Sequence, residues 1–298
     1  MKQANLDTER LGGVDVPSAD RLREMHESPY ILHARGGELK EVSAGKVLLP
    51  RETEVSQIEN PPGCSGSACW MHRIPDGTLL AAVCHSDHVF EEQGDGRLVL
   101  ISGSGAQYVY RSGDDSLTWS NPARVHDWFS EGGVTLTPCG RLGAAIRYQR
   151  PGLPGDPPDL EQRNRGMAGW PYKHVCLVDS DDGGRSWTNP RLLVNGFGQT
   201  RGHPVAPGDG TVVVVHDTRY GPGPPGSRAM VSRDGGRTWE DEVYYLDATS
   251  FTGSYAASAA LEDGTMVTVA GSSGGRTWDD VRDATDFNAI RWKLWKLQ

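Results

Sequence analysis

The sequence predicts an all-β fold, a six-bladed β-propeller of four-stranded antiparallel blades. Three observations predict it. A short turn motif occurs three times, a turn followed by an apolar run occurs four times, and the 298 residues include 38 Gly and 19 Pro. Repeats at intervals of about 50 to 70 residues indicate that one supersecondary unit is used repeatedly. Abundant Gly and Pro suit many short strands joined by tight turns.

The turn motif has the pattern Ser-x-Asp-x-Gly-x-Thr/Ser-Trp and spans residues 112–119, 180–187 and 232–239. Ser and Asp side chains can bond nearby backbone N–H groups and hold a turn. The Gly supplies a positive φ angle, and the Trp places a large apolar ring under the turn, between adjacent blades. We therefore expect each copy to be a hairpin. Residues 271–278 lack the Asp and the first Ser, and indicate a degenerate copy or a surface turn.

The second repeated motif is an Asp-Gly or Cys-Gly turn followed by an apolar run. This pattern predicts a hairpin turn that leads into a strand. Such runs suit the inner strands of a propeller, because neighbouring blades cover both of their faces. In three predicted blades this turn precedes the turn motif, which pairs Gly77 with Trp119, Gly140 with Trp187, and Gly210 with Trp239. The four copies of this second motif are residues 75–83, 138–146, 208–216 and 262–270.

The two ends of the chain have different predicted roles. Residues 1–36 indicate an N-terminal arm or a short helical lead-in, with the helix at Ala19–His26. The alternating residues 287–297 predict a terminal strand that pairs with N-terminal strands and closes the ring. Six blades of about fifty residues would use the whole chain, whereas five would suffice if residues 1–60 contribute only closure strands.

Residues 150–172 are rich in Pro and Gly and have no strand periodicity. A long insertion of this kind is usually a rim loop that shapes a binding site. Trp170 and the arginines of the segment favour that interpretation over a disordered excursion.

The turn motif resembles the Asp box, or BNR repeat, of the sialidase-type β-propellers. The resemblance covers about residues 46–298 at the level of repeats, and it implies a single sialidase-like propeller domain over residues 37–298. In that family the Asp boxes lie away from the catalytic face, so they indicate the fold and not the active site. The family uses a Tyr nucleophile, a Glu that activates it, an Asp acid/base and three Arg that hold the substrate carboxylate.

The ends of the inner strands of a propeller meet at the centre of one face, where a ligand pocket is expected. Guanidinium forks match a carboxylate bidentately, and a neutral phenol avoids the repulsion that an anionic nucleophile would meet beside that carboxylate. Residues with suitable chemistry at these strand ends are His85, Asp87, His88, Glu131, Arg147, Arg150, Arg201, His203, Asp217, Arg219, Arg228 and Tyr255.

The resemblance implies roles for several of these residues. Tyr255 matches the nucleophile, Glu131 the residue that activates it, and Asp87 the acid/base, with Glu91 or Glu92 as alternatives. Arg147 resembles the second arginine of the substrate clamp, and Arg219 is favoured as the third, with Arg228 in reserve. The other expected substrate-binding residues are Arg201, His85 and His203.

One departure from the family pattern leaves the activity open. The first arginine of the clamp belongs to an Arg-Ile-Pro motif, but Ser65–Ser67 occupy its place, and Arg73–Pro75 abut the first Asp-Gly turn in a different register. Besides a sialidase-like exo-glycosidase, two hypotheses therefore remain. One is a non-hydrolytic glycan-binding propeller that uses aromatic platforms. The other is an acidic-polysaccharide lyase or other glycosidase with a histidine base. The residues they would use are Trp70, Trp128 and Trp170 for the first, and His85, His88 and His203 for the second.

Composition limits the partners. The net charge of −9 argues against nucleic acid, although a locally basic pocket can still bind an anionic sugar. No stretch resembles a membrane span, and residues 1–13 have no apolar signal segment. We expect a cytoplasmic protein, or a secreted or periplasmic one if a signal has been removed. We expect a carbohydrate partner and no cofactor, and the oligomeric state is open.

The five cysteines do not form a metal-binding pattern. Cys64 and Cys69 are close enough in sequence for a disulfide, but no second pair stands at metal-ligand spacing, so we expect no metal. Cys84 and Cys176 lie in apolar strands and are expected to be core residues.

Overall fold

A computed structural model describes much of the chain, and all structural statements concern that part. The described backbone covers residues 8–11, 14–17, 31–34, 39–48, 68–73, 79–83, 89–92, 98–102, 106–114, 117–118, 120–121, 123–127, 129–152, 154, 172–193, 199–218, 226–240, 242–247, 256–272 and 289–297.

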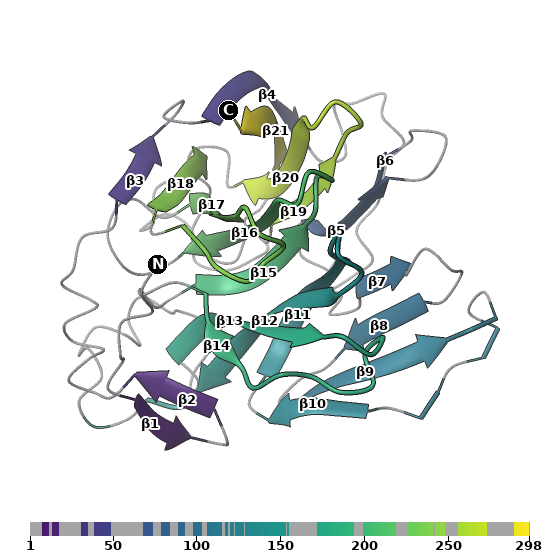
Figure 1. The fold of residues 1–298 in the computed structure, drawn as a ribbon. Helices are drawn as coiled ribbons and strands as arrows, with labels where there is room; N and C mark the ends of the chain where they lie inside the picture. Colours follow the sequence, from purple (N-terminus) through teal and green to yellow (C-terminus); the bar gives the residue numbers. More distant parts are fainter. Residues whose placement is uncertain are drawn as a thin grey trace.

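The structure is all-β, with sheets that are antiparallel apart from one parallel strand pair (Figure 1). Two small sheets contain two strands each. One pairs β1 (Thr8–Leu11) with β2 (Val14–Pro17), and the other pairs β5 (Ala68–Arg73) with β6 (Leu79–Val83).

Two four-stranded sheets are built from consecutive strands. The first contains β7 (Val89–Glu92), β8 (Leu98–Ser102), β9 (Ala106–Ser112) and β10 (Ala123–Asp127). The second contains β11 (Phe129–Leu136), β12 (Leu142–Arg150), β13 (Tyr172–Ser180) and β14 (Arg191–Leu192).

Two further sheets each gain a strand from the N-terminal part of the chain. The first contains β15 (Gln199–Val205), β16 (Val212–Thr218), β17 (Gly226–Ser232) and β18 (Glu242–Asp247), with β3 (Ile31–Ala34) parallel to β18. The second contains β19 (Ala256–Ala260), β20 (Met266–Ser272) and β21 (Ala289–Leu297), and β4 (Leu39–Leu48) is antiparallel to β21.

The pairing of β21 with β4 confirms the prediction that the terminal strand closes onto N-terminal strands. The strands β1 to β3 lie within the segment predicted to be an arm or lead-in, whereas the predicted helix at Ala19–His26 lies outside the described residues. The number of blades stays a prediction.

One predicted grouping is wrong. Gly77 and Trp119 were assigned to one blade, but β5 and β6, which flank residue 77, form a sheet of their own. The first copy of the turn motif instead follows β9 and precedes β10, in a sheet that begins at β7. The order of two motifs along the chain does not fix strand pairing, because β7 and β8 come between them and pair with each other.

The first strands of successive sheets lie next to one another. β11 contacts β7 and β15, and β19 contacts β15 and β5, so these five strands line up across the middle of the molecule (Figure 1). The close approach of β15 to β12 and β13 of the preceding sheet requires glycine, since a Cβ on Gly202 would lie 2.7 Å from the Cβ of Ala145 and 2.9 Å from Cγ1 of Val175.

The predicted turns between first and second strands are present after β11, β15 and β19. Gly140, Gly210 and Gly264 have φ angles of 80°, 89° and 77°, which L-residues with a side chain rarely adopt. At the first of these turns, the amide of Gly140 donates to the carbonyl of Thr137 over 2.8 Å.

The turn motifs form compact hairpins, as predicted. In the copy at 232–239 the Ser232 hydroxyl accepts from the Gly236 amide over 2.8 Å, and Asp234 accepts from the amide and hydroxyl of Thr238 over 2.8 and 2.7 Å. Burial alone would raise the pKa of Asp234, but hydrogen bonds from Thr238, Ser232 and the Arg237 amide lower it to about 2. The copy at 180–187 has the same bonds around Ser180 and Asp182.

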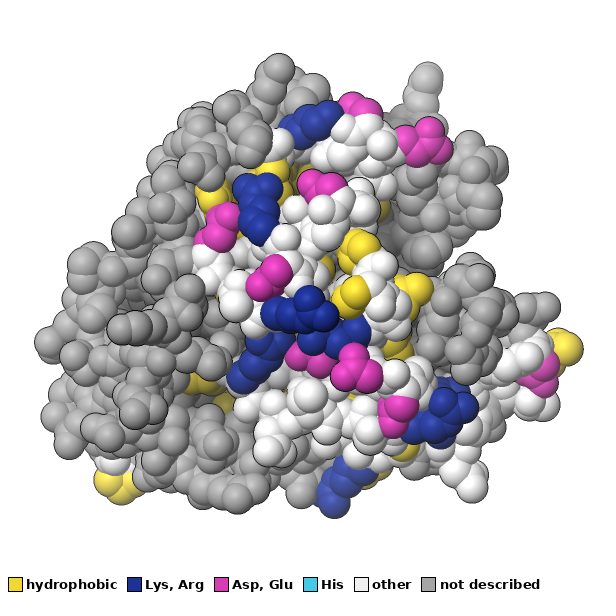
Figure 2. Space-filling view, viewed as in Figure 1, with side chains coloured by type: hydrophobic (Ala, Val, Ile, Leu, Met, Phe, Trp, Pro, Cys, Tyr) yellow, Lys and Arg dark blue, Asp and Glu magenta, His cyan; other side chains and the backbone are white. Residues whose placement is uncertain are grey.

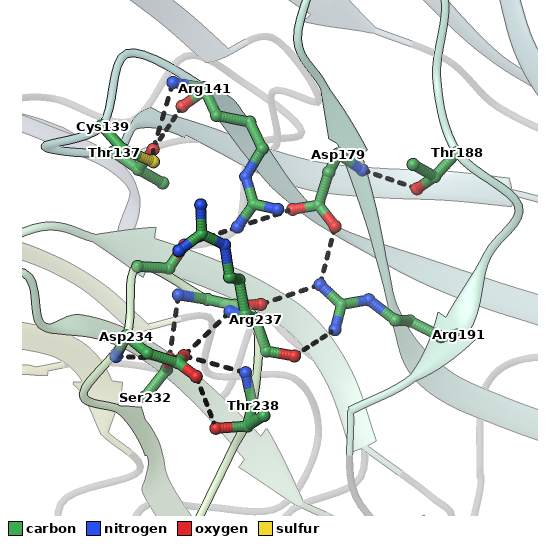
Figure 3. Close-up of polar contacts among 12 residues, drawn as sticks. Thr137, Cys139, Arg141, Asp179, Thr188, Arg191, Ser232, Asp234, Arg237 and Thr238 are labelled. Atoms are coloured by element: carbon green, nitrogen blue, oxygen red, sulfur yellow. Dashed lines mark hydrogen bonds and ion pairs between the residues drawn. The ribbon is translucent and has the colours of Figure 1, made fainter.

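Arginines from one sheet clamp the hairpin of the next sheet (Figure 3). Arg141 donates to the Gly235 carbonyl over 2.6 Å, and Arg191 donates to the Gly236 carbonyl over 2.8 Å and to Asp179 over 2.6 Å. The preceding sheet repeats this arrangement, since Arg111 donates to the carbonyl of Gly184 over 2.9 Å. Each clamp therefore joins two sheets at the end that carries the hairpins.

Apolar layers fill the seams between sheets. The seam between the β11–β14 and β15–β18 sheets contains Ala145, Val175 and Leu177 from one side and Val212, Val214, Met230 and Trp239 from the other. Trp187 packs in the preceding seam, so two of the three motif tryptophans lie between sheets as predicted, while Trp119 is outside the described residues. Cys176 is buried, as predicted for a core residue, and burial raises the pKa of its thiol.

Candidate functional site

The sheets have two distinct ends, and most of the sequence-predicted site residues belong to one of them. Register places Leu142 opposite Ser180 and Val212 opposite Ser232. Leu142 and Val212 follow the turns between first and second strands, and Ser180 and Ser232 begin turn-motif hairpins, so both kinds of turn lie at one end of the sheets. The opposite end carries Arg150 beside Tyr172 and Thr218 beside Gly226. We call this opposite end the site end. Because the inner strands β11, β15 and β19 begin there, it is where a shared pocket is expected.

Glu131 and Arg147 form a buried ion pair at the site end. One guanidinium nitrogen, Nη2, donates to Oε1 of Glu131 over 2.7 Å, and Nη1 lies 2.6 Å from Oε2. The two side chains are only 4% and 5% exposed. A fork-to-fork contact of this kind fixes the orientation of both groups. A carboxylate that accepts it retains further lone pairs, so Glu131 can also accept a hydrogen bond from a substrate or a phenol.

Side-chain alternation extends this pair into a buried polar layer. Ala145 on β12 and Val175 on β13 face the seam toward the β15–β18 sheet, and the register between these strands is unbroken. Residues two apart share a face, so Arg147 and Gln149 on β12 and Lys173 on β13 face the same seam beyond its apolar part.

The neighbouring sheet contributes to the same layer. Val214 on β16 and Met230 on β17 face this seam, and His216 and Arg228 lie two residues further toward the site end in an unbroken register. We call Arg147, Gln149, Lys173, His216 and Arg228 the seam layer. All five are buried, and Lys173 is fully so.

The layer is rich in positive charge. It holds the guanidinium groups of Arg147 and Arg228 and the amine of Lys173, and Arg147 contacts the carboxylate of Glu131. Sequence reasoning had selected Arg147 and Arg228 because they stand at strand ends, but it missed Gln149, Lys173 and His216. The available signal was their spacing of two residues from a seam-facing apolar side chain.

Arg201 and His203 are both buried at the start of β15. Burial, together with the positive charge of Arg201, lowers the pKa of His203 to about 3. Its Nδ1 accepts a hydrogen bond from the backbone amide of Ser258 on β19, over 3.3 Å, so the ring proton of the neutral imidazole is on Nε2. His203 therefore joins two sheets, and neither of its nitrogens offers a free lone pair to act as a general base.

The remaining predicted residues fall outside the part of the chain whose side chains are described. These are Tyr255, Asp87, His85, His88, Arg219, Arg150, Asp217, Glu91 and Glu92, together with Trp70, Trp128, Trp170 and the Ser65–Ser67 segment. The backbone nevertheless fixes one relation. Tyr255 directly precedes Ala256, which begins the inner strand β19 at the site end.

The opposite face differs in character. In the view of Figure 2, Lys and Arg side chains alternate with Asp and Glu side chains over the described surface, so neither sign of charge dominates it. Within the described residues, no cluster of three or more His, Cys, Asp or Glu side chains could hold a metal ion. No helix in the described part of the chain is long and apolar enough to cross a membrane.

Comparison with known proteins gave structural similarities only. No protein-family model matches the chain, and no curated protein matches it. A protein of unknown function from Dyadobacter fermentans aligns with a TM-score of 0.48 and 18% identity, over 76% of this chain and 52% of its own. A Hadza microbial sialidase aligns with a TM-score of 0.47 and 18% identity, over 63% of this chain and 42% of its own.

The phage phi92 endosialidase aligns with a TM-score of 0.49 and 10% identity, over 75% of this chain and 39% of its own. This chain therefore spans about half the length, or less, of the three structures.

Proposed function

We propose that the chain is a sialidase-like exo-glycosidase that hydrolyses sialic acid or another acidic sugar. The observation that carries the proposal is the buried Glu131–Arg147 pair at the site end of β11 and β12. Glu131 would accept the phenolic proton of Tyr255, which then attacks the anomeric carbon. The guanidinium groups of Arg147 and Arg228 would hold the sugar carboxylate. These roles come from the resemblance described above.

Electrostatics supports an anionic substrate. Three buried arginines, Arg147, Arg201 and Arg228, lie at the site end, whereas the protein as a whole carries a net charge of −9. A cationic pocket within an acidic chain attracts an anionic ligand locally, because charges inside a low-dielectric site are weakly screened. Arg228 is favoured over Arg219 as the third clamp residue, because its buried side chain belongs to the seam layer together with Arg147.

Tyr255 has a chemical reason to be the nucleophile. A phenol has an ordinary pKa near 10, so it needs a base within hydrogen-bond reach. Attack by its oxygen on the anomeric carbon forms a glycosyl-tyrosine bond while the leaving alcohol receives a proton from the acid, for which Asp87 is the candidate. In the second step the Asp87 carboxylate would take a proton from water as the water oxygen attacks the anomeric carbon, the bond from that carbon to the tyrosine oxygen would break, and Glu131 would return its proton to the tyrosine oxygen.

The test is hydrolysis of 4-methylumbelliferyl-sialic acid and 4-methylumbelliferyl-glucuronide by the wild type and by Tyr255→Phe and Glu131→Gln. Removal of a nucleophile or its base is expected to lower kcat by at least about 100-fold. Matched controls are Tyr244→Phe and Glu240→Gln, since the Tyr244 hydroxyl donates to Glu240 over 2.6 Å in the β15–β18 sheet. Both controls should hydrolyse at wild-type rates.

Folded wild-type protein that hydrolyses neither substrate, yet binds the free acids, would replace the proposal with a non-hydrolytic glycan-binding function. Hydrolysis that survives Tyr255→Phe would remove Tyr255 from its role. Incubation with a polysaccharide that contains 4-linked uronic acid tests for a lyase, because expulsion of the sugar at C4 would leave an unsaturated uronic acid with new ultraviolet absorption.

A further inference from the structure

The seam layer contains one lysine, on a strand face that is otherwise apolar toward the hairpin end. Lys173 is fully buried on β13, and its Cα pairs with that of Gln149 on β12. Its seam-facing neighbours toward the hairpin end, Val175 and Leu177, are apolar. Burial of an ammonium group costs more free energy than burial of a methionine of similar length. Apolar packing alone would therefore be served better by methionine.

Lys173 is also adjacent to the ion pair at the site end. Arg147 pairs with Val175, so Lys173 and Arg147 are diagonal neighbours on the same face of adjacent strands. Diagonal neighbours of this kind lie within about 8 Å of each other, measured between Cα atoms. A second basic side chain thus lies on the same face as the guanidinium that holds Glu131, two residues nearer the site end.

We propose that Lys173 is a specificity-determining residue, which makes the site prefer an anionic sugar through its buried charge and without touching the ligand. This inference rests on the proposed function, because it concerns the same site, but it names a residue that the sequence pattern did not mark. A buried charge is poorly screened by salt. At the intermediate dielectric typical of protein sites it changes the affinity of a carboxylate about 10 Å away by about tenfold.

The test compares Lys173→Met, which removes the charge and keeps the length, with Lys173→Arg, which keeps the charge. Lys296→Met is the matched control, because Lys296 is a partly exposed lysine on β21 that bonds the carbonyl of Asp263 near the hairpin end. Calorimetric titration measures binding of N-acetylneuraminic acid, glucuronic acid and neutral glucose. Near-ultraviolet circular dichroism checks folding, and Lys173→Gln replaces the methionine variant if that variant does not fold.

We expect the wild type to bind at least one of the two acids more tightly than glucose. Lys173→Met should bind that acid about tenfold more weakly and bind glucose with unchanged affinity. The affinity of Lys173→Arg for the acid should stay within about threefold of the wild-type value. Lys296→Met should change neither affinity.

Each result separates the inference from the proposed function. Weakened acid binding by folded Lys173→Met, in a protein that hydrolyses nothing, supports the inference and refutes the hydrolase. Normal acid binding by folded Lys173→Met, in a protein that hydrolyses sialosides, refutes the inference and supports the hydrolase. A wild type that binds neither acid overturns the inference, as does an equal loss of glucose and acid binding.

Discussion

Arg147 and Glu131 meet in a two-point contact, with guanidinium nitrogens 2.7 and 2.6 Å from the two carboxylate oxygens, in a place where both side chains are almost fully enclosed. Such a contact is costly to break from one side only, because the remaining charge stays buried without compensation. The pair therefore affects stability as well as chemistry.

Arg147→Met is expected to lower the free energy of unfolding by about 3–5 kcal/mol, since it leaves Glu131 as a buried carboxylate without its guanidinium. The double variant Arg147→Met, Glu131→Leu should recover most of that loss. Urea unfolding followed by tryptophan fluorescence measures both. A single variant that is less than about 1 kcal/mol below wild type would show that Glu131 reaches solvent or another cation.

The clamp across the seam gives a second expectation. Arg191→Met removes hydrogen bonds to the carboxylate of Asp179 and to the carbonyls of Gly236 and Arg237. We expect a loss of about 1–3 kcal/mol, because the bonds to Asp179 and Gly236 are partly buried. Arg185→Met is the matched control, since the Arg185 side chain bonds only the Asp182 carbonyl of its own exposed hairpin among the contacts described. Thermal unfolding measures both variants. The midpoint temperature of Arg191→Met should lie below that of the wild type, and the midpoint temperature of Arg185→Met should stay near it.

Close packing of the inner strand β15 against β12 and β13 makes Gly202 sensitive to a single added carbon. Gly202→Ala would place Cβ 2.7 Å from Ala145 and 2.9 Å from Val175, which forces two sheets apart. We expect a destabilisation of about 1–3 kcal/mol. Gly113→Ala is the control, since no atom lies within 4 Å of the added carbon there. Equal urea midpoints for the two variants would contradict the close approach of β15 to the neighbouring sheet.

The hairpin aspartate gives a pH dependence of defined sign. The pKa of Asp234 is about 2 in the folded state, below the ordinary value of 3.8. Its carboxylate therefore contributes stability that is fully present above about pH 4 and is lost as the pH falls toward 2. The stability difference between wild type and Asp234→Asn should shrink over that range. Urea unfolding at pH 5, 4, 3 and 2.5 measures it, and a difference that grows toward low pH would contradict the assigned hydrogen bonds.

Local features of this fold could be predicted from the sequence, because they are encoded within a few adjacent residues. The turn at Gly140 needs a positive φ, and the hairpin at Ser232 needs a short hydroxyl and a carboxylate at fixed spacing. Both were identified correctly. The strand pairing around Gly77 was not, because two additional strands separate that turn from Trp119 and no local signal states which strands pair.

The candidate site could be predicted only in part, for a related reason. Glu131 and Arg147 stand at the ends of adjacent strands, and strand ends can be identified from the apolar runs that precede or follow them. Lys173 lies in the third strand of its sheet and faces a neighbouring sheet that begins more than twenty residues later in the sequence, at Gln199, and whose strand β17 begins at Gly226. The spacing of two residues from Val175 indicates which face of β13 Lys173 occupies, but its burial is a property of the assembled seam.

The arginine clamps also have a direction. In each case the donor belongs to the earlier sheet and the acceptor to the hairpin of the following one, as with Arg111 and Gly184, and with Arg141 and Gly235. During synthesis from the N-terminus, every donor is therefore made before its acceptor exists. A chain that ended after β14 would carry Arg141 and Arg191 without the carbonyls that they bind, so the β11–β14 sheet would lack these hydrogen bonds until the hairpin of the β15–β18 sheet has formed.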